Sequence, residues 1–301
     1  MSPHRPEEDF LTPPVSITSE PAAPEPGQAV TLTAKFTNTT RIPLRGTVLY
    51  LSVNGTDSQA SALGKVAPGR SVTRTWKTRL PDDAEGVVPF IAHALFDVHG
   101  DGSDCTRATS VLRLPYRSPA SAFDNTGISL DNATTTADID GSRSSLSAEA
   151  LASAGLTPGA SVTYGGIAFT WPDTEPGTPG SKDNVVSSGQ TVRLSGTGGR
   201  LAFLGTSTWG AGKGPGKVVY ADGTEQDFSV DVPDWYGAHP SAAVVLPYRN
   251  TPSGRDDNPV SLFTFGVDLQ DRELRSVVLP KVSDGLMSGV PALHIFAMTV
   301  A

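Results

Sequence analysis

Short runs that alternate apolar and polar residues recur along most of the chain and restrict it to a β-rich fold. In residues 29–36, for example, Val30, Leu32, Ala34 and Phe36 fall on one face, which is the pattern of a strand with one buried side. Turn-forming residues separate these runs, and the chain contains 31 glycines and 25 prolines. The pattern predicts many short strands joined by tight turns.

One segment near the middle of the chain has a helical pattern instead. Ser147 is a suitable N-cap, and Glu149 lies in the first turn, where the helix dipole favours an acid. Gly155 and Pro158 then end the segment. We therefore expect one short helix in an otherwise β-rich chain.

The spacing of the strands divides the 301 residues into two domains. Residues 1–14 are polar and proline-rich and are predicted to be a flexible leader. Residues 15–116 contain about seven short strands, the outline of an immunoglobulin-like sandwich. Residues 120–301 contain roughly eight or more strands and the helix, which fits a jelly-roll. The expected fold class is all-β: two β-sandwich domains, an immunoglobulin-like sandwich followed by a jelly-roll with one short helix.

Charge and composition disfavour several classes of partner. The net charge is −8, and the 23 Lys and Arg residues are scattered, so neither nucleic acid nor a membrane surface is an expected partner. Cys105 is the single cysteine, so no internal disulfide can form. The first residues lack the apolar core of a signal peptide. We expect either a cytoplasmic protein or, if the chain is part of a longer exported one, an extracellular or cell-surface location.

Motifs for catalysis are incomplete. The segment 210–217 lacks the Ser or Thr of a phosphate-binding loop, and a strand follows it where that loop requires a helix. Ser207 lacks the final glycine of a nucleophile elbow. No two of the five histidines have metal-ligand spacing. Three pairs of aspartates could in principle hydrolyse a glycoside, but they are interpreted as turn acids: 138/140, 231/234 and 256/257. We expect no catalytic residues and no enzymatic activity.

Aromatic residues in the second half indicate a site for sugars, because an aromatic face packs against the C–H face of a pyranose. Trp209 lies among small residues in 205–216, which is predicted to be a mobile glycine-rich loop. Further candidates for carbohydrate binding are Trp235, Tyr236, Arg249 and Asn250. The alternative for Trp209 is a structural role, in which its ring closes the end of the sandwich.

A structural calcium ion is a second candidate ligand. Calcium prefers carboxylate and carbonyl oxygens supplied by loops. Asp124, Asn125, Asp138 and Asp140 lie in two predicted loops at the start of the second domain. The alternative is that these residues are solvated turn acids without a metal.

The first half resembles a known domain type. Short motifs carry the resemblance: 25–32, 36–38, 66–69, Trp76 and the turn at 81–86. They are similar to the immunoglobulin-like domain associated with alpha-galactosidases and with NPCBM carbohydrate-binding modules. The resemblance covers residues 12–115 and implies a spacer linked to carbohydrate-active proteins.

The second half resembles the galactose-binding-like jelly-roll at the C-terminus of exported bacterial glycoside hydrolases. The matching segments include 123–128, 150–159, 169–172, 183–186, 201–205, 222–224 and 248–250. This resemblance implies a non-catalytic carbohydrate-binding accessory region of a glycoside hydrolase system, with a glycan or polysaccharide as partner. Two alternatives remain: structural spacer domains that pack against a catalytic domain on the same or a longer chain, or a glycoside hydrolase.

Overall fold

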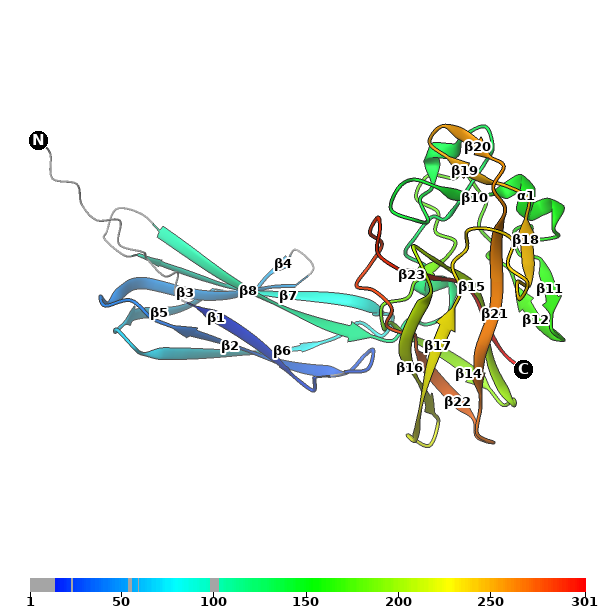
Figure 1. Cartoon of the computed structure of the whole chain (residues 1–301). Coiled ribbons are helices and arrows are strands. Elements are labelled where there is room, and N and C mark those ends of the chain that lie inside the picture. The colour runs from blue at the N-terminus through cyan, green and yellow to red at the C-terminus, as the bar shows by residue number, and fades with distance from the viewer. Residues whose placement is uncertain (1–13, 23, 54–55, 59, 98–102) are drawn as a thin grey trace, which may run out of the picture. The chain divides into compact units, whose positions relative to one another are not determined.

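The chain forms two compact units, which divide between Leu114 and Pro115 (Figure 1). The computed structural model describes residues 14–22, 24–53, 56–58, 60–97 and 103–301. The leader expected at residues 1–14 lies outside the described residues except for Pro14. The described residues form mainly antiparallel sheets and one short α-helix, so the predicted all-β class is confirmed.

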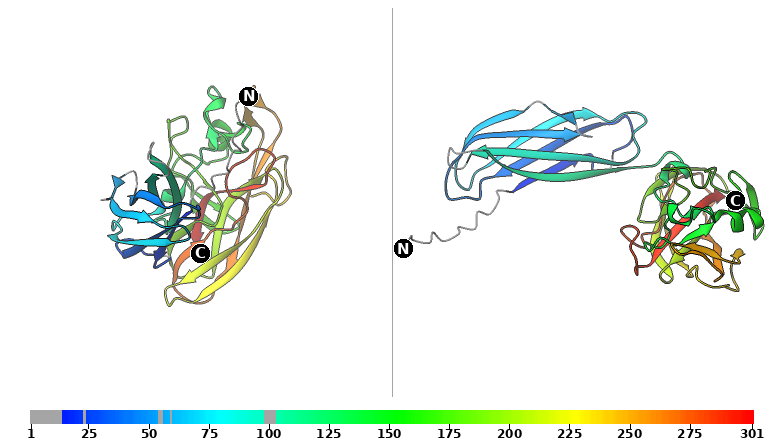
Figure 2. Two further views of the ribbon diagram at one scale, coloured as in Figure 1. Left: turned by 90° about the vertical axis from the view of Figure 1, so that its left-hand side faces the viewer. Right: turned by 90° about the horizontal axis from the view of Figure 1, so that it is seen from above.

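The first unit is a sandwich of two sheets (Figure 2). One sheet has the order β1-β2-β6, with β1 Val15–Glu20, β2 Ala29–Thr37 and β6 Ser71–Arg79. The other has the order β4-β3-β7-β8, and β5 also pairs with β3. Its strands are β3 Leu44–Val53, β4 Thr56–Asp57, β5 Ser61–Val66, β7 Gly86–Asp97 and β8 Ser103–Leu114.

The alternating face of β2 forms the centre of this sandwich. Val30 and Leu32 are buried, and they pack in one cluster with Phe90 of β7 and Leu112 of β8. Each such side chain contributes about 1.5–3 kcal/mol when it is fully buried. The period-two pattern therefore correctly identified the core face of this strand.

The second unit is built on a five-stranded sheet with the order β13-β23-β15-β21-β18. These strands are β13 Val185–Val186, β15 Arg200–Thr208, β18 Val244–Leu246, β21 Val260–Asp268 and β23 Ala292–Val300. A four-stranded sheet with the order β14-β22-β16-β17 faces it. Its strands are β14 Thr191–Gly196, β16 Gly212–Tyr220, β17 Glu225–Val232 and β22 Leu274–Val278.

The five-stranded sheet is covered on both faces. On β15, Leu201 and Phe203 pack toward the four-stranded sheet, whereas Ala202 and Leu204 belong to a second cluster that includes Trp171. As a result, every residue of β15 after Arg200 is buried. A strand with two covered faces needs a continuous run of apolar or internally hydrogen-bonded residues instead of an alternating one.

Smaller elements cover the second face. They are a small sheet with the order β20-β19-β10-β9, the hairpin β11-β12 and the α-helix. The unit also contains two 3-10 helices, and the buried Ala122 of the first belongs to the cluster on the other face. The bounds of these elements are β9 Ile128–Ser129, β10 Ser145–Ser147, α1 Ala148–Ser153, β11 Ser161–Tyr164, β12 Ile167–Thr170, β19 Arg249–Thr251, β20 Gly254–Asp256, η1 Ala120–Ala122 and η2 Thr134–Thr136. In Figure 1, β10, β19, β20 and α1 lie at one end of this unit.

The predicted helix is present and begins as expected. Ser147 is the N-cap, and its Oγ accepts a hydrogen bond from the backbone N–H of Ala150 at 3.0 Å. Glu149 lies in the first turn, while Ala150 and Leu151 are buried. The helix is six residues long, and nothing helical in the described part of the chain has the length and apolarity needed to cross a membrane.

The glycine-rich loop predicted for residues 205–216 is wrong. β15 continues to Thr208 and β16 begins at Gly212, so only three residues connect the two strands. The glycines are needed for close packing: an added Cβ at Gly205 would collide with the carbonyl oxygen of His294, and one at Gly216 would collide with the ring of Phe228. These glycines therefore mark positions where strands pack closely within a sheet, and they do not form a mobile loop.

The substitution Gly205→Ala tests this interpretation. The new methyl group would be forced against the backbone of β23, so we expect a loss of about 1–3 kcal/mol in the free energy of unfolding, as for other overpacked cores. Urea unfolding followed by circular dichroism measures it. Gly199→Ala is the matched control, because no atom lies within 4 Å of its added Cβ. Equal losses in the two variants would contradict the packing role of Gly205.

Candidate functional site

A cavity of about 450 Å³ opens on the second unit and brings together most of the predicted sugar-binding residues. Four chain segments line it: the loop before β10, the turn between β15 and β16, the segment after β17, and the start of β19. The lining side chains include Asp140, Ser142, Trp209, Asp234, Trp235, Tyr236 and Arg249. Residues far apart in sequence therefore meet at one concave surface.

Trp209 is held at the tight turn between β15 and β16. Its φ of 58° is in the left-handed region, which is uncommon for a residue other than glycine. The indole Nε1–H donates a hydrogen bond to the backbone carbonyl of Asp140, and the residue remains 45% exposed. The ring is thus fixed at its polar edge while much of its surface stays accessible.

Trp235, Tyr236 and Arg249 form a stacked group in the cavity. Trp235 is buried in the core, whereas Tyr236 is 53% exposed. The guanidinium carbon of Arg249 lies 5.3 Å from the ring centre of Trp235 and 4.8 Å from that of Tyr236. Arg249 Nε also donates to Asp256 Oδ2 at 2.9 Å, across the β19–β20 pair. Trp235 therefore supplies the base of the group and Tyr236 its accessible surface.

Two carboxylates complete the lining. Asp140 is 5% exposed, and its Oδ1 accepts the backbone N–H groups of Ser142 at 2.8 Å and Ser144 at 3.0 Å. Among the described residues, none donates to Asp140 Oδ2. Asp234 accepts the backbone N–H of Tyr236 at Oδ1, 2.8 Å away, and that of Gly210 at Oδ2. The carboxylates thus fix two of the lining segments.

Asn250, a predicted sugar-binding residue, lies outside this cavity. It is fully buried, and its Nδ2 donates to Ser129 Oγ at 3.0 Å and to Asp131 Oδ1 at 3.1 Å. Adjacent residues on a strand point to opposite faces, so Asn250 faces away from the side on which Arg249 lines the cavity. The prediction for Asn250 is corrected: its side chain is part of the internal structure.

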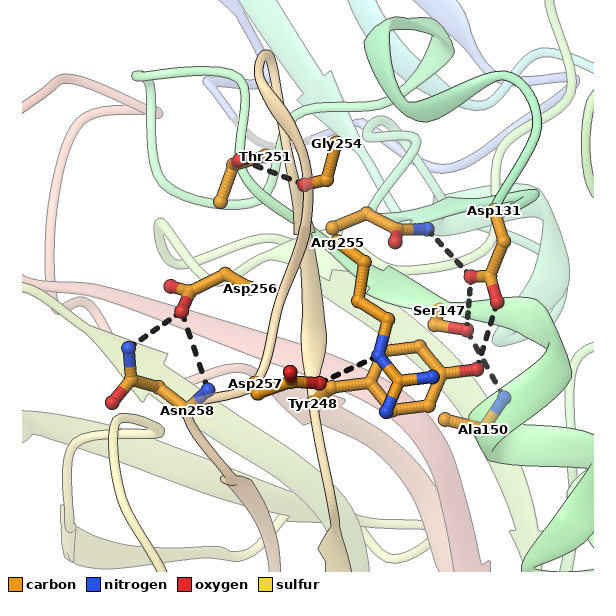
Figure 3. Close-up of polar contacts among 11 residues, drawn as sticks. Asp131, Ser147, Ala150, Tyr248, Thr251, Gly254, Arg255, Asp256, Asp257 and Asn258 are labelled. Carbon is orange, nitrogen blue, oxygen red and sulfur yellow. Dashed lines mark hydrogen bonds and ion pairs between the residues drawn. The ribbon is translucent and has the colours of Figure 1, made fainter.

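Asp131 is the centre of the polar cluster that holds Asn250. Ser147 and Tyr248 also donate to its carboxylate, at 2.6 and 2.8 Å (Figure 3). Burial opposes the charged form of Asp131, but these hydrogen bonds outweigh it and hold the pKa of the carboxyl below its usual value. Arg255 stacks over the ring of Tyr248 at 3.7 Å (Figure 3). The cluster joins β19 to the N-terminus of α1.

The four predicted calcium ligands have local structural roles. Asp124 Oδ1 accepts the backbone N–H of Val186 at 2.9 Å, and Asp138 Oδ1 accepts that of Asp140 at 3.1 Å. Asn125 donates from its side chain to the carbonyl of Asp138 at 3.0 Å. Within the described ranges, no group of three or more His, Cys, Asp or Glu side chains could hold a metal ion. Calcium at these loops stays a prediction, and Asp140 lies in the cavity lining.

A series of buried, hydrogen-bonded side chains runs inward from the end of β15, next to Trp209. His294 Nδ1 lies 2.9 Å from Asn184 Oδ1, and its Nε2 lies 3.5 Å from the hydroxyl of Thr208. Asn184 in turn donates to Asp183 Oδ1 at 2.7 Å. Because the amide N–H of Asn184 faces a carboxylate, its carbonyl faces His294, and His294 carries its proton on Nδ1. The sequence placed His294 in a strand but gave no sign of this chain.

Burial disfavours the charged form of the side chain at each end of this hydrogen-bonded chain, so the two pKa values move in opposite directions. It lowers the pKa of His294 to about 3, against an opposing effect of the nearby Asp140 carboxylate. It raises the pKa of Asp183 to about 6, although hydrogen bonds from Asn184, Gly127 and Ile128 favour the carboxylate. At neutral pH, the chain contains an uncharged imidazole and a carboxylate.

These two shifts have opposite effects on stability. Below pH 6.5 the unfolded chain binds a proton at His294 that the fold excludes, so stability falls as the pH drops toward about 3. The fold binds a proton at Asp183 near pH 6, whereas the unfolded chain does so at 3.8, so stability rises as the pH drops through that range. Between 3.8 and about 6 the two contributions offset each other.

Single substitutions should separate the two contributions. Relative to the unsubstituted protein, His294→Gln should gain stability on acidification and Asp183→Asn should lose it, each with a slope of about 1.4 kcal/mol per pH unit. Urea unfolding between about pH 4 and about pH 6.5 measures these slopes. The double variant is the control and should be closest to the unsubstituted profile. Parallel profiles for all four proteins would contradict the two shifts.

The chemical groups that were rejected as catalytic are buried or paired. Ser207 is fully buried, and its Oγ donates to the carbonyl of Ala292 at 3.1 Å. Asp231 pairs with Lys213 at 2.7 Å, and Asp257 pairs with Arg255 at 2.6 Å. Of the residues that the structure describes, the cavity lining contains two aspartates, Asp140 and Asp234, and two serines, but no histidine. The absence of enzymatic activity stays a prediction.

The fold and cavity define the second unit as a β-sandwich domain with an aromatic, polar-lined surface cavity. Residues 116–301 match the model of the AziU2-like beta-sandwich domain. Because the match spans more than half of the 301 residues, the chain belongs to this family. No curated protein matches the chain.

The resemblances inferred from short motifs are wrong. The match to the AziU2-like domain covers the segment that was assigned to a galactose-binding-like jelly-roll. The motifs were mostly turn residues flanking strands, and β-sandwiches of different families share the same turn chemistry.

The similarities to solved structures are low. Spo0M, a sporulation control protein from Bacillus subtilis, is 18% identical, with 34% of this chain and 49% of that chain covered and a TM-score of 0.23. The chain thus spans about half the length of Spo0M. The collagen adhesin from S. aureus is 10% identical, with 95% and 80% covered and a TM-score of 0.13. These values carry no argument about function.

Proposed function

We propose that the second unit is a non-catalytic carbohydrate-binding domain and that the cavity beside Trp209 is its glycan site. The observation that carries the proposal is the pair of accessible aromatic side chains, Trp209 and Tyr236, on one concave surface that polar side chains also line. Aromatic rings pack on the C–H faces of a pyranose, while carboxylates and hydroxyls bind its hydroxyl groups.

The polar groups of the cavity suit hydroxyl ligands. Asp140 and Asp234 offer carboxylate oxygens as acceptors, and Ser142 offers a hydroxyl. A second cavity, of about 240 Å³ beside α1, is lined mainly by apolar side chains, and Glu149 is its one charged residue. The larger cavity therefore offers more of the hydrogen-bonding groups that a sugar requires.

The neighbouring reactive groups support binding without reaction. Ser207 lies two residues before Trp209, and His294 lies on the neighbouring strand β23. Both side chains are fully buried and hydrogen-bonded. A bound glycan would meet the aromatic rings and the carboxylates before any hydroxyl or imidazole of these residues. The proposal therefore assigns the site a recognition role.

Replacement of the exposed ring tests this function. A glycan array identifies the bound sugar, and calorimetry with that sugar then compares variants. We expect Trp209→Ala to weaken binding about tenfold or more, because stacking of about 1.4 kcal/mol is lost. Trp209→Phe keeps a ring but loses the bond to the carbonyl of Asp140, so it should bind with an intermediate affinity.

Tyr50→Ala is the matched control for removal of an aromatic side chain. Tyr50 lies on β3 of the first unit, where it stacks on His93. Its replacement should leave glycan binding unchanged. Binding that is unaffected by Trp209→Ala would remove the cavity as the site. Failure of the whole chain to bind any arrayed glycan would contradict the function and favour structural spacer domains.

A further inference from the structure

The charges around the cavity restrict the kind of sugar that fits it. Asp140 and Asp234 are both acidic, and Arg249 is the one basic residue in the lining. Arg249 already pairs with Asp256 at 2.9 Å, and both side chains are partly buried. The positive charge of the lining is therefore balanced from outside the cavity, whereas the two carboxylates remain as excess negative charge.

The carboxylates receive hydrogen bonds only from uncharged groups. In the part of the chain that the structure describes, their donors are the backbone N–H groups of Ser142, Ser144, Gly210 and Tyr236, and no basic side chain forms an ion pair with either acid. His294 lies near Asp140 but is uncharged at neutral pH. The cavity therefore has an unbalanced charge of two carboxylates.

Asp140 supplies an acceptor that its own structure does not use. The residue is 5% exposed, its Oδ1 accepts two backbone N–H groups, and none of the described residues donates to its Oδ2. A carboxylate oxygen with no donor from the protein can accept a hydrogen bond from a ligand, and a cationic donor binds it more strongly than a neutral one. The geometry thus provides a place for a ligand group that is both positive and hydrogen-bonding.

The aromatic rings favour the same kind of ligand. The indole N–H of Trp209 is taken by the carbonyl of Asp140, so the ring presents its electron-rich surface and not its donor. Tyr236 is half-exposed, and Arg249 already lies over its ring at 4.8 Å, which shows that this ring accepts a cation. Ammonium groups bind between aromatic rings and carboxylates by the same interaction.

We infer that the ligand of this cavity is an amino sugar with a free, protonated amino group. The inference rests on the proposed function and adds the sign of the ligand's charge. The ammonium group would donate to Asp140 Oδ2 and face Asp234, while the ring of the sugar packs on Trp209 or Tyr236. Uronic acids and sulfated sugars would be repelled by the same carboxylates.

Three tetrasaccharides with one β-1,4 backbone test the inference: glucosamine, N-acetylglucosamine and glucose tetramers. Calorimetry with the full chain at about pH 6, where the free amine carries a proton, gives their affinities. We expect the glucosamine tetramer to bind about tenfold or more tightly than the glucose tetramer, a difference of about 1.4 kcal/mol. The preference should shrink in high salt, because the attraction is electrostatic.

Asp140→Asn is the decisive variant. The asparagine Oδ1 can still accept the N–H groups of Ser142 and Ser144, so the substitution exchanges the unused Oδ2 for an NH₂ group and removes one negative charge. The preference for glucosamine over glucose should fall several-fold. Asp257→Asn is the matched control, because Asp257 is an exposed acid that pairs with Arg255 and does not line the cavity.

The outcomes separate the inference from the proposed function. Equal affinities for the glucosamine and glucose tetramers, or a preference that Asp140→Asn leaves unchanged, would overturn the inference while sugar binding stands. Tighter binding of the N-acetylated tetramer than of the free amine would also overturn it. If none of the tetramers binds and the glycan array is empty, both the inference and the proposed function are contradicted.

Discussion

Burial of the five-stranded sheet on both faces is the constraint on which the rest of the second unit depends. Because no side chain of central β15 reaches bulk water after Arg200, each must be apolar or hydrogen-bonded within the sheet. Thr206 donates to the carbonyl of Ser261 at 2.8 Å, and Ser207 donates to that of Ala292 at 3.1 Å. The polar residues thus bind the neighbouring strands β21 and β23 to β15.

The same strand positions the cavity. Trp209 follows directly after β15, and the segment after β17 is attached to that strand end, since Trp235 N–H donates to the carbonyl of Ser207 at 2.7 Å. Asp234 then accepts the N–H of Gly210, in the turn itself. The two accessible rings are therefore held by backbone hydrogen bonds to a buried strand. A site fixed in this way loses less conformational entropy on binding than a site on a mobile loop.

The sequence predicted the elements of the fold better than the relations between them. The alternation of β2 and the N-cap at Ser147 are local patterns, and both were correct. The glycines of 205–216 were misread, because turns and close strand packing both select glycine and only the neighbouring strand distinguishes them. Family resemblance failed for a similar reason: turn motifs are shared by unrelated sandwiches.

The candidate site shows the same limit. Four of the predicted sugar-binding residues do line one cavity, because they lie in turns and at strand ends that the fold brings together: Trp209, Trp235, Tyr236 and Arg249. Asn250 was misplaced because the strand that sets the direction of its side chain is only three residues long and all three are polar, so its sequence does not show which residue faces inward. Asp140 was assigned to calcium, and the structure places it in the cavity lining; loop acids suit calcium, turn capping and sugar hydroxyls equally in sequence.

The charge of the cavity is the property that the sequence hides most completely. Counted along the chain, Arg249 lies near several aspartates and would neutralise a site built from any of them. Only the pairing of β19 with β20 shows that Arg249 forms an ion pair with Asp256, which lies outside the lining. Within the described lining, Asp140 and Asp234 are then left without a positive charge that offsets theirs. Without that pairing, Arg249 would offset one of the two carboxylates, and the lining would carry a single net negative charge. In the proposed site, the excess negative charge that would favour a cationic ligand therefore depends on which acid the hairpin pairs with the single arginine of the lining.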